Sequence, residues 1–108
     1  MNNGVSESDW KRFRAKVPEW RERYLERKNR ELAAVFTDKN RTPTDQFWEV
    51  EERVNKEAKT LRRCLDGHRR SGMVDSMASM MRCGMLTDAD LVDFSEDLRA
   101  TLAVLKEI

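Results

Sequence analysis

Apolar residues recur at helical spacing over residues 42–66, and this stretch organises the rest of the chain. The apolar positions follow one another in steps of three or four residues: Phe47, Val50, Val54, Ala58, Leu61 and Leu65. Thr42 can cap the helix, Pro43 suits its first position, and Asp45 lies where a capping-box carboxylate belongs. The opposite side is charged. The pattern therefore predicts one amphipathic helix of about six or seven turns, which other helices must cover.

The front of the chain carries a second apolar rhythm that a proline interrupts. Ser8 is a candidate cap, and Trp10, Phe13 and Val17 follow at helical spacing before Pro18. Proline disrupts a helix interior and disfavours helical geometry in the residue before it. We therefore expect a short helix over about 8–16 and a second helix over about 18–36, with one kinked helix as the alternative. Residues 37–41 form the loop into the organising helix.

The rear of the chain contains two more helix patterns. Gly67 suits a left-handed end of the organising helix. Residues 67–72 connect that helix to the next one, which is predicted over about 71–83 and ends before Gly84. A last helix is predicted over about 88–106. Its start has a Thr87–Asp90 capping box, with Leu86 placed to pack on the following turn.

These elements predict an all-α fold without strands, because no alternating apolar pattern occurs. We expect a small antiparallel helical bundle of four main helices plus a short N-terminal helix. Residues 1–7 are polar and predicted to fray, and residues 8–108 form a single helical domain. With only four Gly and two Pro in 108 residues, the elements should be long.

Charge and cysteine content narrow the class of protein. Charged residues make up 38% of the chain, yet the net charge is only +1. Residues 1–43 hold 11 basic and 7 acidic side chains, whereas residues 71–108 hold 3 basic and 7 acidic side chains. This charge asymmetry between the two ends of the chain suits intramolecular docking or head-to-tail self-association. No apolar run is long enough for a membrane span, and the first residues do not resemble a signal peptide. Two cysteines suit free thiols in a cytoplasmic protein, and a bridge between Cys64 and Cys83 stays open.

A cluster of methionines is the least ordinary feature. Five of the six lie within residues 73–85 and cover more than one side of a helix. Flexible thioethers suit surfaces that adapt to partners, although they also fill small cores. We take this helix as the candidate interface of a homodimer. The interface candidates are Met73, Val74, Met77, Met80, Met81 and Met85.

Two basic clusters suggest an alternative surface. Cations interleaved with aromatic residues can bind nucleic acid, or they can form an ordinary solvated helix face. Arg69 and Arg70 beside a helix start could also hold an anion, or lie in a plain connector. The basic-surface candidates are Lys11, Arg12, Arg14, Lys16, Arg62, Arg63, His68, Arg69 and Arg70.

The residues offer no motif for catalysis, a cofactor or a metal. Cys64, His68 and Cys83 give three potential zinc ligands but no fourth, and the acids after Thr87 lack calcium-loop spacing. We therefore expect a small helical protein-interaction or regulatory module, not an enzyme, that binds a protein partner or itself as a homodimer. A nucleic-acid-binding regulator that uses the basic helix faces is the alternative.

Overall fold

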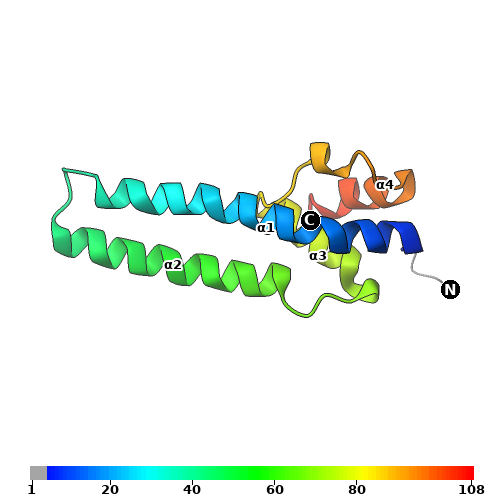
Figure 1. The fold of residues 1–108 in the computed structure, drawn as a ribbon, viewed down its shortest axis with the longest axis horizontal. Coiled ribbons are helices and arrows are strands. Elements are labelled where there is room, and N and C mark those ends of the chain that lie inside the picture. Colours follow the sequence, from blue (N-terminus) through cyan, green and yellow to red (C-terminus); the bar gives the residue numbers. More distant parts are fainter. Residues whose placement is uncertain (1–4) are drawn as a thin grey trace.

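A computed structural model describes residues 5–108, which fold into helices connected by short loops. The long helices α1 (Glu7–Phe36) and α2 (Pro43–Leu65) form an antiparallel hairpin (Figure 1). The shorter elements η1 (Arg70–Gly72), α3 (Met73–Arg82), η2 (Asp88–Leu91) and α4 (Glu96–Leu105) gather at one end of it. Residues 5–108 contain four α-helices and no strand, so the predicted all-α class is confirmed.

Helix α1 runs without a break through Pro18, which corrects the predicted division at this residue. Phe13 before the proline and Trp20 after it are both buried in one core, and this packing holds the two segments in line. The helix also begins earlier than predicted, because Ser6 and not Ser8 caps it by accepting a hydrogen bond from the Asp9 amide at 3.1 Å. Of the segment predicted to fray, residues 1–4 lie outside the described residues, and Val5 is buried.

The organising helix starts and ends as predicted. Thr42 caps α2 by accepting a hydrogen bond from the Asp45 amide at 3.1 Å, and Pro43 takes the first position. Beyond its end, Gly67 has a left-handed φ of 65°, and Gly84 after α3 has a φ of 79°. Residues that carry a side chain rarely adopt a positive φ, so glycine is suited to both helix ends.

The predicted last helix is interrupted. Its Thr87–Asp90 capping box forms, and the Thr87 amide donates to the Asp90 carboxylate at 2.7 Å, but only the short η2 follows. Ser95 then caps a separate helix, α4, with its hydroxyl accepting from the Leu98 amide. The buried carboxylate of Asp9 fixes this break, since it accepts hydrogen bonds from the Ser95 amide at 3.0 Å and the Ser95 hydroxyl at 2.6 Å.

The hydrophobic core lies at one end of the hairpin. It joins residues up to Tyr24 with residues from Cys64 onward, and we call these parts, 5–24 and 64–108, the head. The core residues are Val5, Phe13, Trp20, Tyr24, Cys64, Met73, Met77, Ala78, Met80, Met85, Leu86, Leu91, Phe94, Leu98 and Leu102.

The rest of the hairpin, residues 25–63, projects beyond the core, and we call it the arm. The molecule measures 57 × 25 × 23 Å, with a radius of gyration of 16.7 Å. A compact domain of this length has a radius of gyration of about 13 Å. Within the arm only Val35 is buried. The chain is therefore a compact head with a two-helix extension (Figure 1).

Candidate functional site

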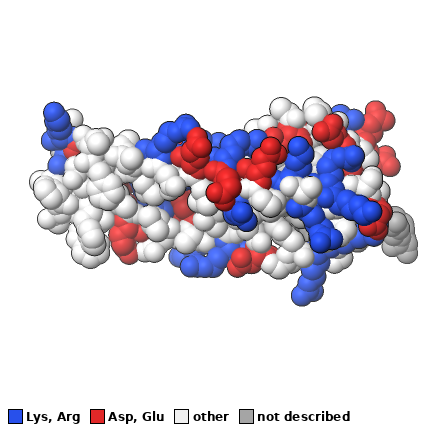
Figure 2. Space-filling view, viewed as in Figure 1, with Lys and Arg blue, Asp and Glu red and all other residues white. Residues whose placement is uncertain are grey.

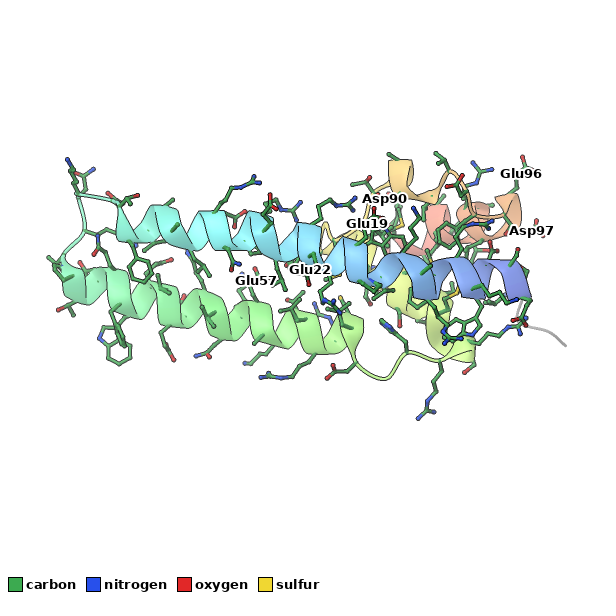
Figure 3. All side chains as sticks on the ribbon, in the orientation of Figure 1. Glu19, Glu22, Glu57, Asp90, Glu96 and Asp97 are labelled. Atoms are coloured by element: carbon green, nitrogen blue, oxygen red, sulfur yellow. The ribbon has the colours of Figure 1, made fainter. Side chains whose placement is uncertain are left out.

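Polar side chains connect the two helices of the arm. Glu57 of α2 accepts a hydrogen bond from the Tyr24 hydroxyl and lies 3.5 Å from Lys28 Nζ, and Figure 3 shows it between the helices. Near the tip, Gln46 donates from its amide to the carbonyl of Phe36 at 3.1 Å. The side of α2 that faces α1 is therefore largely polar, and burial of apolar surface contributes little to the pairing of the helices.

The apolar stripe of α2 is only partly covered, which corrects the expectation that other helices cover all of it: Val50, Ala58 and Leu61 are half-buried, whereas Phe47 and Val54 are exposed. Phe47 follows Gln46 in the chain and Ala58 follows Glu57, so each is rotated by about 100° from a residue that contacts α1. Phe47 is 59% exposed and Val54 is 44% exposed. The neighbouring Trp48 is also 59% exposed, with its ring centroid 5.0 Å from that of Phe47.

Helix α1 repeats this offset in the arm. Leu25 follows Tyr24, and Phe36, which is 54% exposed, follows the buried Val35. In an antiparallel pair of right-handed helices, equal rotation along each chain points to the same side of the pair. The two stripes therefore share one side of the hairpin, which we call the arm face. It consists of Leu25, Leu32, Phe36, Phe47, Val50, Val54, Ala58 and Leu61.

The arm face is large and carries little charge. Figure 2 shows mostly uncharged surface over the arm on the side that faces the reader, and denser charge over the head. Aromatic side chains present about 150–250 Å² each and valine somewhat less, so those of Phe36, Phe47 and Val54 together expose roughly 300 Å². A patch of this size is as large as those that mark binding sites on monomeric proteins.

A hollow of about 340 Å³ lies between the helices of the arm, and its lining is charged. Lys28 pairs with Glu57 at 3.5 Å, and Arg53 donates to Glu49 at 2.6 Å. Because the lining holds three basic and four acidic side chains, its charges nearly balance, and the hollow has little net charge with which to select a ligand. The lining residues are Lys28, Glu31, Leu32, Glu49, Glu52, Arg53, Lys56 and Glu57.

The predicted methionine interface belongs to the core of the head, and this location corrects its assignment as a docking surface. Met77 is 0% exposed, while Val74 and Met81 are half-buried against the core. Helix α3 is apolar on several sides because α1, α2 and α4 surround it within the same chain. The buried interface candidates are Met73, Met77, Met80 and Met85.

Several of the basic-surface candidates make contacts within the chain. Arg70 donates to the carbonyl of Val5 at 2.9 Å and to Glu7 at 3.0 Å, so it fastens the start of α1. Arg12 lies 6.0 Å from the Phe94 ring and 3.8 Å from Asp9. The remaining candidates come from α1, the end of α2 and the connector. Their positions are Lys11, Arg14, Lys16, Arg62, Arg63, His68 and Arg69.

The cysteines and the histidine meet, but not as metal ligands. His68 Nε2 lies 2.7 Å from the Cys64 carbonyl oxygen, and its ring packs edge-on against Phe13. The two sulfur atoms face each other, with Cys64 Sγ and Cys83 Sγ 3.9 Å apart. Among residues 5–108, no three His, Cys, Asp or Glu side chains are placed to hold a metal ion.

Sequence reasoning found the residues of the arm face but assigned them to the core. Exposed side chains of Phe36, Phe47 and Trp48 are apolar at helical spacing, and such spacing does not distinguish a covered face from an exposed one. In the part of the chain that the structure describes, no helix has the length and apolarity needed to cross a bilayer. Comparison of the chain with protein-family models, curated proteins and solved structures finds no match.

Proposed function

We propose that this chain is a protein-interaction module that forms a homodimer through the arm face. The observation that carries the proposal is the exposure of Phe36, Phe47 and Val54 on the arm face, where no element of residues 5–108 covers them. Two hairpins that pack face to face make a four-helix bundle, in which each hairpin covers the apolar side of the other. The head folds around its own core, and the arm is the part that needs a second chain.

The size of the exposed apolar surface is suited to a second copy of the chain. A standard interface buries about 800 Å² on each partner. The exposed side chains of Phe36, Phe47 and Val54 supply somewhat more than a third of that area, at about 300 Å². The half-buried Leu25, Leu32, Val50 and Leu61 and the polar rim around them supply further area.

The charges on α2 favour an antiparallel arrangement of the two copies. Exposed Glu51 flanks the arm face in the half of α2 near the tip, whereas exposed Arg62 flanks it in the half near the head. Val54 stands at the middle of the helix. A two-fold axis close to Val54 sets the acidic half of each α2 against the basic half of the other. Complementary charge of this kind selects the partner and its orientation.

The experiment is sedimentation equilibrium of the wild-type chain and two matched variants. Val54→Glu places a charge in the middle of the arm face, and Val104→Glu makes the same change at an exposed valine of the head. We expect dimers for the wild type and for Val104→Glu, and monomers for Val54→Glu, with unchanged helical circular dichroism. A wild-type chain that stays monomeric at about 100 μM, a concentration well above a micromolar dissociation constant, overturns the homodimer.

A charge exchange tests the orientation. The variant Glu51→Lys places basic residues beside the arm face in both halves of α2, and Arg62→Glu places acidic residues there in both halves. We expect each variant alone to dimerise less than the wild type and the mixture to form heterodimers. A mixture that remains monomeric while both variants stay folded contradicts the antiparallel arrangement.

The nucleic-acid alternative gives a different result in the same samples. It requires binding of labelled duplex DNA or RNA that falls steeply with salt and weakens in Lys11→Ala/Arg14→Ala. Such binding by a monomeric chain would replace self-association as the proposed activity.

A further inference from the structure

The two cysteines form a close pair at the junction of α2 with α3. Cys64 lies in the last turn of α2, and Cys83 directly follows α3. Their sulfur atoms are 3.9 Å apart, and both thiols are free. A disulfide needs a separation of about 2.05 Å, so rotation of the side chains and a small shift of the backbone close the gap. Cys83 stands at the end of α3, directly before Gly84, so its side chain lies at the edge of the helix and not within it.

Solvent can reach only one member of this pair readily. Cys64 is buried, whereas Cys83 is half-buried and lines an open hollow of about 360 Å³. Arg63, Ser79 and Arg82 form the rest of the lining. A small neutral oxidant can enter the hollow and meet Cys83 first, with Cys64 beneath it.

The surroundings of Cys83 favour its thiolate. The hydrogen bond from the Cys64 thiol lowers the pKa of Cys83 to about 6 against the opposing effect of burial, and the Met85 amide and the Arg63 charge add to the lowering. The same contact and burial raise the pKa of Cys64, which keeps its proton. Because the thiolate is the nucleophile, Cys83 is the reactive member at neutral pH.

We propose that Cys83 and Cys64 form a reversible redox pair that hydrogen peroxide or a similar small peroxide oxidises to an intramolecular disulfide. This site is independent of the arm face and of the proposed homodimer. Low-pKa, accessible cysteines next to a resolving cysteine are the ones that respond to peroxides. The geometry assigns Cys83 as the attacking sulfur and Cys64 as the resolving sulfur.

The reaction proceeds in two balanced steps. The Cys83 thiolate attacks one peroxide oxygen, the O–O bond breaks, and the displaced hydroxide takes a proton to become water. The product is a sulfenic acid on Cys83. Cys64 sulfur then attacks the sulfenic sulfur, and the Cys64 proton leaves with the hydroxyl group as a second water. Two thiols lose two electrons in total, and one peroxide gains them. A cellular dithiol reverses the reaction by thiol–disulfide exchange.

The first test is oxidation of the reduced wild-type chain with hydrogen peroxide, followed by alkylation and peptide mass mapping. We expect a single link between the peptides of Cys64 and Cys83, with the loss of two hydrogens and no covalent dimer. A limiting amount of iodoacetamide should label Cys83 before Cys64, and its rate should rise with pH up to a plateau above about pH 7. Exclusive formation of intermolecular disulfides, or no oxidation while free cysteine is oxidised, overturns the pair.

Single substitutions separate the two roles. Cys64→Ser should stop at the sulfenic acid, which dimedone traps on Cys83, and Cys83→Ser should react at least about tenfold more slowly because Cys64 is buried and protonated. Equal oxidation rates in the two variants contradict the assignment. If Cys64→Ser fails to fold, the order of labelling in the wild-type chain decides the same question.

Arg63 is a positioning residue in this proposal, and its effect can be isolated. Arg63→Gln should slow alkylation of Cys83 several-fold at pH 6.5 and move the plateau to higher pH. Arg99→Gln, which removes the same charge from an exposed residue of α4, should leave the profile where it is. Identical profiles for all three chains would remove Arg63 from the site.

Discussion

The head and the arm share the long helix α1 but are held together in different ways. In the head, α1 packs through Phe13 and Trp20 into a closed core with α3 and α4. In the arm, α1 meets α2 through hydrogen bonds and ion pairs such as Lys28–Glu57. Exposed ion pairs each contribute about 0–1 kcal/mol, whereas a buried large apolar side chain contributes about 1.5–3 kcal/mol. The head therefore carries most of the stability of the isolated chain.

This difference shows that one helix can serve two purposes along its length. The first half of α1 satisfies its apolar side within the chain, and the second half leaves Leu25 and Phe36 for another molecule. Figure 1 shows α1 passing from one region to the other without a bend that would separate them. Substitutions in the two halves should consequently have different effects, and the following predictions test this from the largest expected effect to the smallest.

The largest effect is expected from Met77→Ala in the head. Met77 is fully buried, and its truncation should lower the free energy of unfolding by about 2–5 kcal/mol through lost transfer energy and a new cavity. Urea titration of the chain at low micromolar concentration measures this quantity. Met81→Ala, at a half-buried position of the same helix, should lower the free energy of unfolding by less than Met77→Ala does. A loss below about 1 kcal/mol for Met77→Ala would mean that the head is loosely packed.

Asp9→Ala should have the second largest effect. Its carboxylate is buried and accepts hydrogen bonds from the Ser95 amide and hydroxyl, so truncation removes two charged hydrogen bonds between α1 and the start of α4. We expect a loss of about 1–3 kcal/mol in the free energy of unfolding, measured in the same urea titration. Asp93→Ala removes an exposed carboxylate nearby and is the control. Equal effects for the two variants would show that the contact between α1 and α4 is not specific.

A smaller, pH-dependent effect is expected from the pair of Arg23 and Asp90. Burial raises the pKa of Asp90, but the Arg23 hydrogen bond and charge and the Thr87 amide outweigh it, so the pKa lies below its ordinary value. The two side chains meet at 2.8 Å, and Figure 3 shows Asp90 beside α1. A lowered carboxylate pKa stabilises the fold above the ordinary pKa of about 4, and this contribution is lost as the pH falls through the folded-state pKa.

Asp90→Asn should remove that contribution. Since Arg23 is half exposed, we expect the free energy of unfolding at pH 7 to be lower in the variant by less than about 1 kcal/mol. This difference between the variant and the wild type should narrow toward pH 2.5. Thermal unfolding over this pH range is the measurement. A difference that grows toward low pH would contradict the direction of the shift.

The smallest effect on the isolated chain is expected from Phe47→Ala in the arm. Its side chain is mostly exposed, so the substitution should change the free energy of unfolding at submicromolar protein concentration by no more than about 0.5 kcal/mol. The wild-type melting temperature should rise with protein concentration if dimers form, and Phe47→Ala should weaken that dependence. A large loss at high dilution would show that Phe47 stabilises the single chain, which removes the difference between the two regions.

Local signals in the sequence predicted the elements better than their packing. The Thr42 cap and the glycines at 67 and 84 act between neighbouring residues, and each was predicted from the residue types alone. The path of α1 through Pro18 depends on core contacts on both sides of the proline, which no local pattern contains. The break before Ser95 likewise depends on Asp9, a residue 86 positions away in the chain.

For the candidate sites too, the sequence predicts local patterns but not how the elements pack around them. Helical spacing identified Phe47 and Val54 as one stripe, but which stripe of α2 faces α1 depends on Gln46 and Glu57 finding partners there. The methionines were recognised as unusual, yet their burial depends on three helices meeting around α3. The closeness of Cys64 and Cys83 arises from the turn between α2 and α3, which composition does not reveal.

The continuity of α1 also limits how the length of this protein can change. One residue inserted after Leu25 would rotate everything beyond it by about 100° and move Phe36 away from the side that Phe47 occupies. Seven residues inserted into each helix of the arm would lengthen it by about 10 Å and restore nearly the same orientation. Length variants that preserve the arm face should therefore differ by whole heptads, added to both helices together.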